Sequence, residues 1–362
     1  MSKKKNNQHK QMPRTRAEQN GAHAAPLQVS GEITDITAEG MGVLKHEGIV
    51  YFTDGGVIGD TVTAEVTKLK KNFGEARIVA ITDASPFRTS VDCTAFEGMN
   101  DIEARRVCGV LSRPGFENSH LRCGGCDFRN FLYSSQLEWK KHVVTSALTK
   151  IGGIENPPLD RIVGAEERFS YRNNIQFPVR LISGKPRIGF FARRSNDLVV
   201  FETCRLIPPK INELVRELES FLEAKNIPVK PAAGTQNKSA RGEALDHGVL
   251  KHIGVRISPK EELILIFVTT RQSWNFELPE ELLTRYRIVS VYENVNPSDY
   301  QTYGRDWIHL WGADSWEESL LGKRFQLFPA SFFQVHREQT ESLYQIAIFY
   351  AFGDSDANKS FL

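Results

Sequence analysis

The run GEITDITAEGMGVLKHEGIVYF, residues 31–52, predicts the fold of the N-terminal part of this 362-residue chain. Short stretches of alternating apolar and polar residues are interrupted in it by glycines, and the same pattern continues at 61–69 and 74–79. Strands of this length, separated by glycine turns, are typical of a small closed β-barrel. The sequence therefore predicts a barrel over residues 28–84, the size of an OB-type fold.

The residues before the barrel are strongly basic. Between residues 2 and 16 there are six lysines and arginines, and no acidic residue occurs before Glu18. Such a segment indicates a solvated, disordered tail over residues 1–27, and attraction to RNA phosphates is the functional alternative. The net charge of the whole chain is only +2, so composition by itself does not indicate a nucleic-acid-binding protein.

A second basic run lies inside the predicted barrel. Lys68, Lys70 and Lys71 stand beside Phe73 at a predicted loop. Cations next to an aromatic ring are how such barrels often contact single-stranded nucleic acid. A solvated hairpin tip explains these residues equally well.

The segment Cys123-Gly124-Gly125-Cys126 indicates a metal or cluster site. Two thiolates separated by two residues can reach one centre through a tight turn, and the glycines let the backbone fold around it. Cys93 and Cys204 are further candidate ligands.

The chain has no apolar run that would span a bilayer or serve as a secretory signal, so we expect it in the cytoplasm. Five cysteines in a reducing compartment favour ligation over disulfides, and the residues alone fit a zinc site or an iron–sulfur cluster.

Two more regions follow the barrel. Residues 85–325 mix helical and strand-like patterns and predict an α+β domain that carries the cysteine site. The expected elements are helices at 134–148 and 210–224 and strands at 175–181, 188–191, 198–201, 250–257 and 262–269. The first helix is expected to start at its serines, and the apolar spacing of Leu137, Val144 and Leu148 predicts an amphipathic face. An exposed loop is expected at 231–246. Residues 326–362 predict a helix from about Glu338 to Phe352 and the first residues of a buried strand, which is how an α/β domain begins.

In their order along the chain, these motifs resemble the S-adenosylmethionine-dependent RNA (uracil-5-)-methyltransferases that carry an N-terminal TRAM domain. The matching segments are 36–43, 50–52 with 59–60, 85–88, 123–126, 136–140, 151–154, 171–173, 188–191, 204 and 331–335. The resemblance implies a multidomain protein with an N-terminal TRAM β-barrel, a central α+β domain with a cluster site, and the start of an incomplete α/β methyltransferase domain.

The resemblance also implies ligands and cofactors. Four cysteines hold a [4Fe-4S] cluster in that family, and they map onto Cys93, Cys123, Cys126 and Cys204. Residues 101–120 look like an insertion that contains Cys108, which is the alternative first ligand. Gln334 corresponds to a residue that binds S-adenosylmethionine. The residues alone would favour a structural contact for this glutamine.

The resemblance implies an RNA substrate, with 23S rRNA expected and with no DNA or membrane partner. Methylation of uracil C5 needs a thiolate that adds to C6 and a base that removes the C5 proton. None of the cysteines aligns with the family's nucleophile, and no glycine-rich cofactor loop is present, so no catalytic residue is assigned in this chain. We therefore expect little or no activity from it alone.

Two other interpretations are a non-catalytic RNA-binding protein with a structural cluster or zinc site, and a radical S-adenosylmethionine enzyme. A radical S-adenosylmethionine enzyme needs three cysteines separated by three and then two residues, and this chain does not contain such a triplet.

Overall fold

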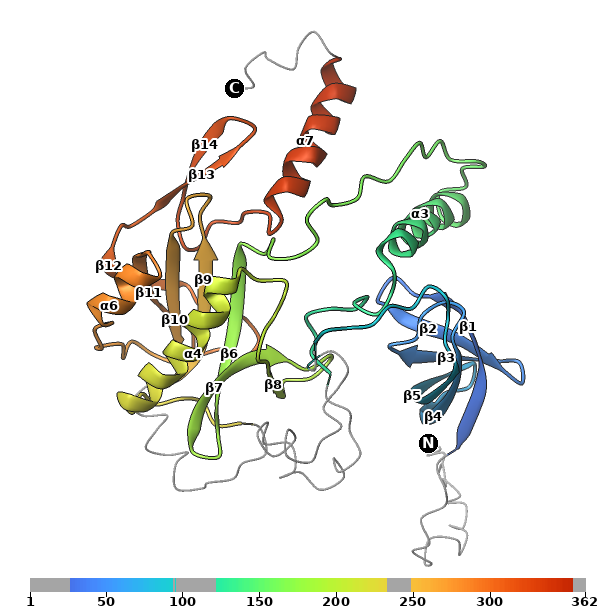
Figure 1. Ribbon diagram of the computed structural model, residues 1–362, viewed down its shortest axis with the longest axis horizontal. Coiled ribbons are helices and arrows are strands. Elements are labelled where there is room, and N and C mark those ends of the chain that lie inside the picture. Colours follow the sequence, from blue (N-terminus) through green and yellow to red (C-terminus); the bar gives the residue numbers. More distant parts are fainter. Residues whose placement is uncertain (1–26, 94, 96–121, 233–248, 354–362) are drawn as a thin grey trace, which may run out of the picture. The chain divides into compact units, whose positions relative to one another are not determined.

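The computed structural model describes residues 27–93, 95, 122–232 and 249–353 (Figure 1). The chain divides into two compact units, Met1–Arg88 and Thr89–Leu362. The basic tail, Cys108, most of the predicted loop at 231–246 and the predicted final strand lie outside the described residues. The predicted boundary between residues 325 and 326 stays a prediction.

The first unit is a closed barrel of five strands, which confirms the predicted fold of residues 28–84. The strands are β1 (Gln28–Ile36), β2 (Met41–His46), β3 (Ile49–Asp54), β4 (Thr61–Leu69) and β5 (Phe73–Asp83). They are hydrogen-bonded in the order β1-β2-β3-β5-β4, and β4 pairs with β1 to close the ring. Inward-facing residues such as Ile33, Leu44 and Val62 are fully buried. Gly74 is needed in β5 because a Cβ there would lie 2.5 Å from the ring of Tyr51.

A buried carboxylate stabilises the end of the barrel. Asp60 is fully buried and accepts hydrogen bonds from the backbone N–H groups of Val57 at 2.7 Å and Ser85 at 3.0 Å. The Arg88 guanidinium donates to both of its oxygens. Burial alone would raise the pKa of Asp60, but these hydrogen bonds and the charge of Arg88 lower it below its usual value. The carboxylate therefore links the loop before β4 to the segment after β5.

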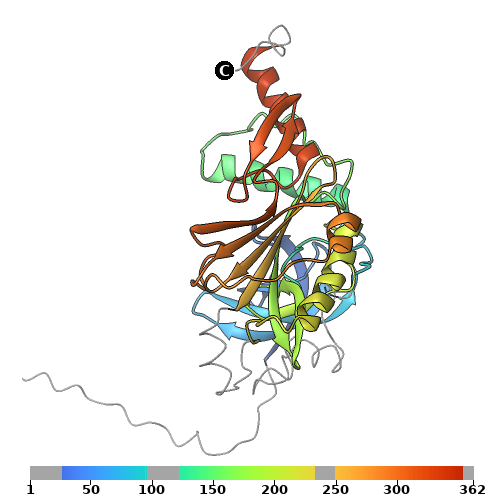
Figure 2. The same cartoon turned by 90° about the vertical axis from the view of Figure 1, so that its left-hand side faces the viewer.

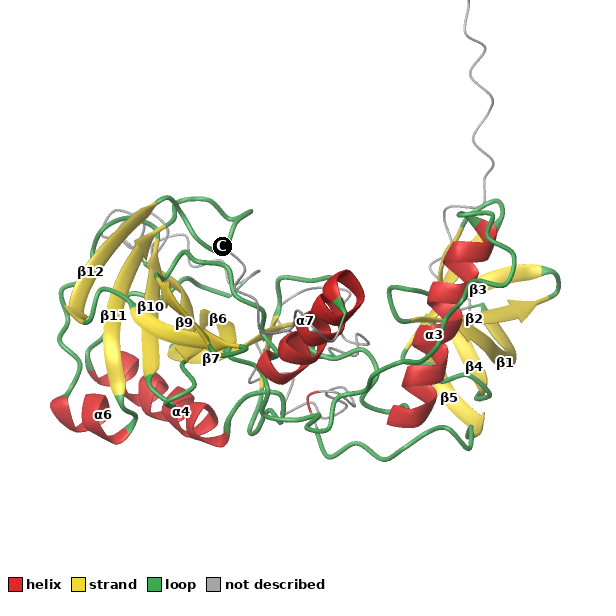
Figure 3. Cartoon of the chain, turned by 90° about the horizontal axis from the view of Figure 1, so that it is seen from above, coloured by secondary structure: helices red, strands yellow, loops and turns green. Residues whose placement is uncertain are grey.

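The second unit is built on a seven-stranded sheet. Its strands are β6 (Asn174–Ile182), β7 (Lys185–Phe191), β8 (Leu198–Val200), β9 (Leu250–Ile257), β10 (Leu263–Thr269), β11 (Ile288–Val295) and β12 (Asp306–Gly312). Their order is β12-β11-β10-β9-β6-β7-β8. The expected pairing of β9 with β10 is confirmed and is antiparallel, whereas β10 and β11 are parallel. Helices α4 (Pro209–Ala224) and α6 (Glu280–Arg285) lie on the same side of this sheet (Figures 2 and 3).

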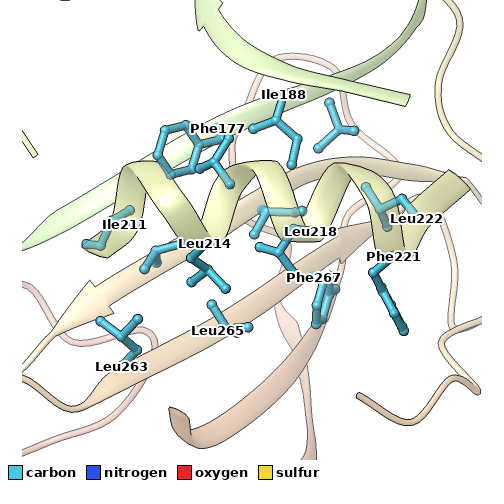
Figure 4. Packing of buried hydrophobic residues seen from close by; sticks show 14 of the residues in the cluster. Phe177, Ile188, Ile211, Leu214, Leu218, Phe221, Leu222, Leu263, Leu265 and Phe267 are labelled. Atoms are coloured by element: carbon cyan, nitrogen blue, oxygen red, sulfur yellow. The ribbon is translucent and has the colours of Figure 1, made fainter. Parts of the chain in front are cut away.

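The main core lies between α4 and the sheet (Figure 4). Apolar residues of α4 recur at three- and four-residue spacing, as expected for one buried helix face. On β10, Leu263, Leu265 and Phe267 belong to the same core cluster. Complete burial of one such side chain stabilises the fold by roughly 1.5–3 kcal/mol. This core fixes the sheet on which the site described below is built.

The opposite face of the sheet is covered by other segments. Ile264 packs against Trp316 and Leu327, which lie on the hairpin of β13 (Trp316–Leu320) and β14 (Lys323–Leu327). Arg337, at the start of α7 (Arg337–Phe352), forms an ion pair with the buried Glu318 of β13 at 2.9 Å. The predicted helix at 338–352 is confirmed, and this contact connects it to the hairpin.

Helix α3 (Tyr133–Lys150) forms where the sequence predicts a helix, but its details differ from the prediction. The residue at its N-cap is Leu132, so the predicted serine start is wrong. The single buried residue of α3 is Trp139, which contacts the ring of Phe128 at 4.7 Å, while Val144 is exposed. The predicted apolar face at 137, 144 and 148 is therefore not the buried one. Within the described ranges, no helix is both long and apolar enough to cross a membrane.

Candidate cysteine centre and adjoining cavity

The loop that carries Cys123 and Cys126 is bound to the end of β7. The Cys123 N–H donates to Ala95 O at 2.8 Å, and the Gly124 N–H donates to Phe191 O at 2.9 Å. A Cβ at position 124 would lie 3.0 Å from Phe191 O, so glycine permits this close approach. The Gly125 N–H points at Cys123 Sγ at 3.4 Å. Gly124 therefore permits the tight backbone packing expected for this segment, whereas a Cβ at Gly125 would meet only Cys123 Sγ, at an ordinary contact distance of 3.4 Å.

Cys204 is positioned by helix α4. The buried Asn212 accepts a hydrogen bond from the Cys204 N–H at 2.8 Å and donates one to Cys204 O at 3.1 Å. Cys93 and Cys123 both pack against a small apolar cluster that contains Ala192. All four described cysteines are free thiols of intermediate exposure.

The four thiols influence one another electrostatically. Burial is the largest cause that raises the pKa of Cys126 to about 12, and the charges of Cys204, Cys123 and Cys93 raise it further. For Cys123, burial followed by the charges of Cys204 and Cys93 raises the pKa to about 11. Three separate segments therefore bring their thiols into one neighbourhood. No three or more His, Cys, Asp or Glu side chains of the described ranges are grouped so that they could hold a single metal ion.

An ion-pair network ties the same three segments together. Asp92, next to Cys93, accepts hydrogen bonds from the guanidinium groups of Arg129 and Arg205. Arg129 follows Cys126 by three residues, and Arg205 follows Cys204 directly. Both guanidinium groups also lie over the ring of Phe169, with centroid distances of 4.8 Å for Arg129 and 4.0 Å for Arg205. The segments that carry the thiols therefore also place two arginines on one aromatic ring.

These arginines line a cavity of about 690 Å³ beside the cysteine loop. Its walls are formed by the cysteine loop, the first turns of α3, the segment 162–171 and the start of α7. Tyr171 and His336 stack within it at 4.3 Å with an interplanar angle of 11°. Arg168 lies over the ring of Tyr133 at 4.8 Å, and the Tyr133 hydroxyl accepts a hydrogen bond from the Ala165 N–H at 2.6 Å. The lining is thus both cationic and aromatic.

This cavity is not predicted by the sequence pattern. One signal was present in the run Arg168-Phe169-Ser170-Tyr171-Arg172, where cationic and aromatic residues are close neighbours in the sequence. The remaining lining residues come from segments far apart in the chain, such as Lys140 and Gln339. Only the fold brings them to the same place.

Gln334, predicted to bind a cofactor, lies in an anchored but exposed segment before α7. The buried Asn173 donates from its side-chain amide to Gln334 O at 2.9 Å, and its backbone N–H donates to Val335 O at 3.1 Å. Arg256 donates to Ser331 O at 2.7 Å. The backbone of the segment is therefore fixed, while the Gln334 side chain is exposed to solvent.

The basic run of the barrel lies at a hairpin tip, as the sequence predicts. Lys70 and Lys71 are exposed in the turn between β4 and β5. The Lys70 ammonium lies 4.6 Å from the centroid of Phe73, whose ring packs edge-on against Phe52 at 5.6 Å. The tip therefore presents cations beside an aromatic ring that the barrel holds in place.

Comparison with known proteins finds one matching domain family and several similar proteins. Residues 32–79 match the TRAM domain family. An uncharacterized RNA methyltransferase of Listeria innocua is 31% identical over 323 residues, which are 87% of this chain and 63% of that protein. One from Staphylococcus aureus strain COL is 28% identical over 328 residues, or 89% of this chain and 65% of that protein. The chain thus spans slightly less than two thirds of the length of these relatives.

A solved structure shares the fold. The tRNA (uracil-54, C5)-methyltransferase of Pyrococcus abyssi, in complex with S-adenosyl-L-homocysteine, superposes with a TM-score of 0.60 at 23% sequence identity. The match covers 88% of this chain and 64% of that one. A TRAM domain match over residues 32–79 and similarity to proteins named RNA methyltransferase thus occur together along most of the sequence.

Proposed function

We propose that this protein acts in the S-adenosylmethionine-dependent methylation of uridine C5 in RNA, with 23S rRNA as the substrate. One observation carries the proposal: similarity to proteins named RNA methyltransferase runs through 87–89% of this chain, across both units. The fold shared with a tRNA uracil-C5 methyltransferase supports the chemistry at C5. The choice of 23S rRNA over tRNA rests on the combination of a TRAM barrel with a four-cysteine centre.

The described residues fit a role in holding RNA. The hairpin tip with Lys70, Lys71 and Phe73 offers cations and an aromatic face, as do many surfaces that bind single-stranded nucleic acid. The four described cysteines belong to one neighbourhood. We therefore assign none of these four as the nucleophile that adds to uracil C6.

We further propose that Cys93, Cys123, Cys126 and Cys204 hold a [4Fe-4S] cluster. Burial and mutual repulsion disfavour four thiolates in one place, and a cationic iron–sulfur core would compensate that charge. Four thiolates from one chain are a common ligand set of a [4Fe-4S] cluster, and the resemblance to the cluster-bearing methyltransferases favours the cluster over a single zinc ion.

We propose that Gln334 contributes to binding S-adenosylmethionine, which supplies an electrophilic methyl group when bound. The support is local: the backbone on either side of Gln334 is held by the buried Asn173, and the side chain is free to reach a ligand. A fixed backbone with an exposed polar side chain is a suitable position for a binding residue.

A non-catalytic RNA-binding protein is the second candidate, because the cationic and aromatic surfaces need no methyl donor to bind RNA. Gene disruption separates the two functions. A stop codon among the codons for β1 should remove one 5-methyluridine from the 23S rRNA of the organism that encodes the chain. Mass spectrometry of separated rRNA and tRNA measures this loss. Unchanged 5-methyluridine in both fractions would contradict the methyltransferase proposal, and a loss confined to tRNA would contradict the assignment of 23S rRNA.

A further inference from the structure

The cavity beside the cysteine loop carries more positive charge than its own acids neutralise. Four lysine or arginine side chains and two aspartates line it. Asp92 is shared by Arg129 and Arg205, and Asp127 pairs with Arg193, which lies outside the lining, at 2.6 Å. Among the described residues, Arg168 and Lys140 form no ion pair. The cavity therefore retains two cations able to take an anionic ligand.

The same cavity offers aromatic planes. Phe169 is covered by two guanidinium groups, and Tyr171 is stacked on His336. Flat arginine and aromatic groups stack on unstacked nucleobases, and arginine binds phosphate through directed hydrogen bonds. A volume of about 690 Å³ lies within the range of sites for small ligands, roughly 300–1,000 Å³. A cationic lining of this kind is poorly suited to the positively charged sulfonium of the methyl donor.

We propose that this cavity holds one unstacked nucleotide of the RNA, other than the uridine that is methylated. Its phosphate lies against Arg168 and Lys140, and its base stacks beside the pair formed by Tyr171 and His336. The inference rests on the proposed function, because it takes RNA as the ligand. It assigns a positioning role to the second unit, which therefore contacts RNA independently of the hairpin tip of the barrel.

The test measures the affinity of the full chain for a fluorescein-labelled single-stranded RNA by anisotropy at several salt concentrations. Arg168→Gln should weaken binding about 5- to 10-fold and lower the slope of log affinity against log salt by about 0.7, because one phosphate contact is lost. The matched control is Arg216→Gln, which removes an exposed arginine of α4 that does not line the cavity. The control should bind RNA as the unchanged chain does.

A second variant separates stacking from charge. Tyr171→Leu should weaken binding about 5-fold or more without changing the salt slope, because stacking on a base is uncharged. Circular dichroism melting should confirm that each variant is folded. Photo-crosslinking with 4-thiouridine in the RNA should label the peptide that contains Phe169 and Tyr171.

The outcomes distinguish the two proposals. If Arg168→Gln and Tyr171→Leu both bind RNA as tightly as the unchanged chain, the cavity assignment is wrong, while loss of 5-methyluridine on gene disruption would still support the proposed function. If the unchanged chain binds no RNA, the cavity assignment is also wrong, because the proposed ligand is a nucleotide of that RNA. Unchanged 5-methyluridine on gene disruption would contradict the proposed function whatever the binding results.

Discussion

At the scale of single residues, the fold depends on a few buried polar groups with defined partners. Asp60 is the clearest case, since its carboxylate is fully buried and accepts hydrogen bonds from two backbone N–H groups and from Arg88. A buried charge left without its partners strongly destabilises the fold, so the loss of any one partner should lower the stability of the barrel. Asn212 and Asn173 act similarly by fixing Cys204 and the segment around Gln334.

Asp60→Asn should lower the free energy of unfolding of the barrel by about 3–5 kcal/mol, because Arg88 then lacks its buried carboxylate. The pKa of Asp60 is lowered in the folded state, so its stabilisation is complete above the unfolded value near 3.9 and is lost as the pH falls further. The difference in the free energy of unfolding between Asp60→Asn and the unchanged chain should be constant from pH 7 to about 4.5. It should become smaller below about pH 4.

Hydrogen exchange of barrel amides measures this effect, because all five tryptophans lie after residue 88 and do not report on the barrel. Asp83→Asn, at the exposed end of β5, is the matched control and should change exchange little. Equal exchange rates for Asp60→Asn and Asp83→Asn would show that the buried carboxylate does not stabilise the barrel.

At the scale of elements, helix α4 has two roles. Its apolar face packs on the sheet, and Asn212 in its first turns holds the backbone of Cys204. The packing of the core and the position of a predicted ligand therefore depend on the same helix. Loss of packing under α4 should disturb the cysteine centre as well as the sheet.

Leu218→Ala should destabilise the second unit by about 2–5 kcal/mol, because Leu218 is fully buried on the apolar face of α4 and its truncation leaves a cavity. Urea unfolding followed by tryptophan fluorescence measures this change, since Trp274 belongs to the same core cluster. Glu213→Ala, on the exposed side of α4, is the control and should shift the midpoint little. If both variants had the same midpoint, the proposed packing of α4 would be wrong.

The sequence predicts elements whose pattern is local and misses features that depend on the fold. The barrel strands, α4 and the pairing of β9 with β10 follow from alternation and helical spacing, and all three are confirmed. The buried face of α3 is missed because Trp139 packs on Phe128, a contact that no periodicity indicates. Lys251 is another example: it is 1% exposed within β9 and is satisfied by the carbonyl groups of Asn296 and Ser298.

The site is predictable to a similar degree. The cysteine pair is identified by its spacing, and the structure brings Cys93 and Cys204 into the electrostatic neighbourhood of that pair. The cavity is not predictable from local pattern, because its lining joins residues from 89 to 339. Its arginines are recognisable only after the fold has placed Arg129 and Arg205 on Phe169.

At the scale of the whole molecule, the cysteine centre connects the features of the second unit. The segments that carry Cys93, Cys126 and Cys204 also supply Asp92, Arg129 and Arg205, whose ion pairs shape the cavity. A cluster held by the four thiols would therefore stabilise the arrangement that the cavity needs. We propose that these four cysteines, and not Cys108, form one iron–sulfur centre.

The most direct test is the iron and acid-labile sulfide content of the protein purified without oxygen, together with its visible absorption. We predict about four irons per chain. Cys126→Ser should abolish the absorbance and destabilise the second unit while the barrel stays folded, whereas Cys108→Ser, the matched control, should retain iron and absorbance. Full absorbance in Cys126→Ser, loss of iron in Cys108→Ser, or one zinc and no iron in the unchanged chain would show that these four cysteines do not hold an iron–sulfur cluster.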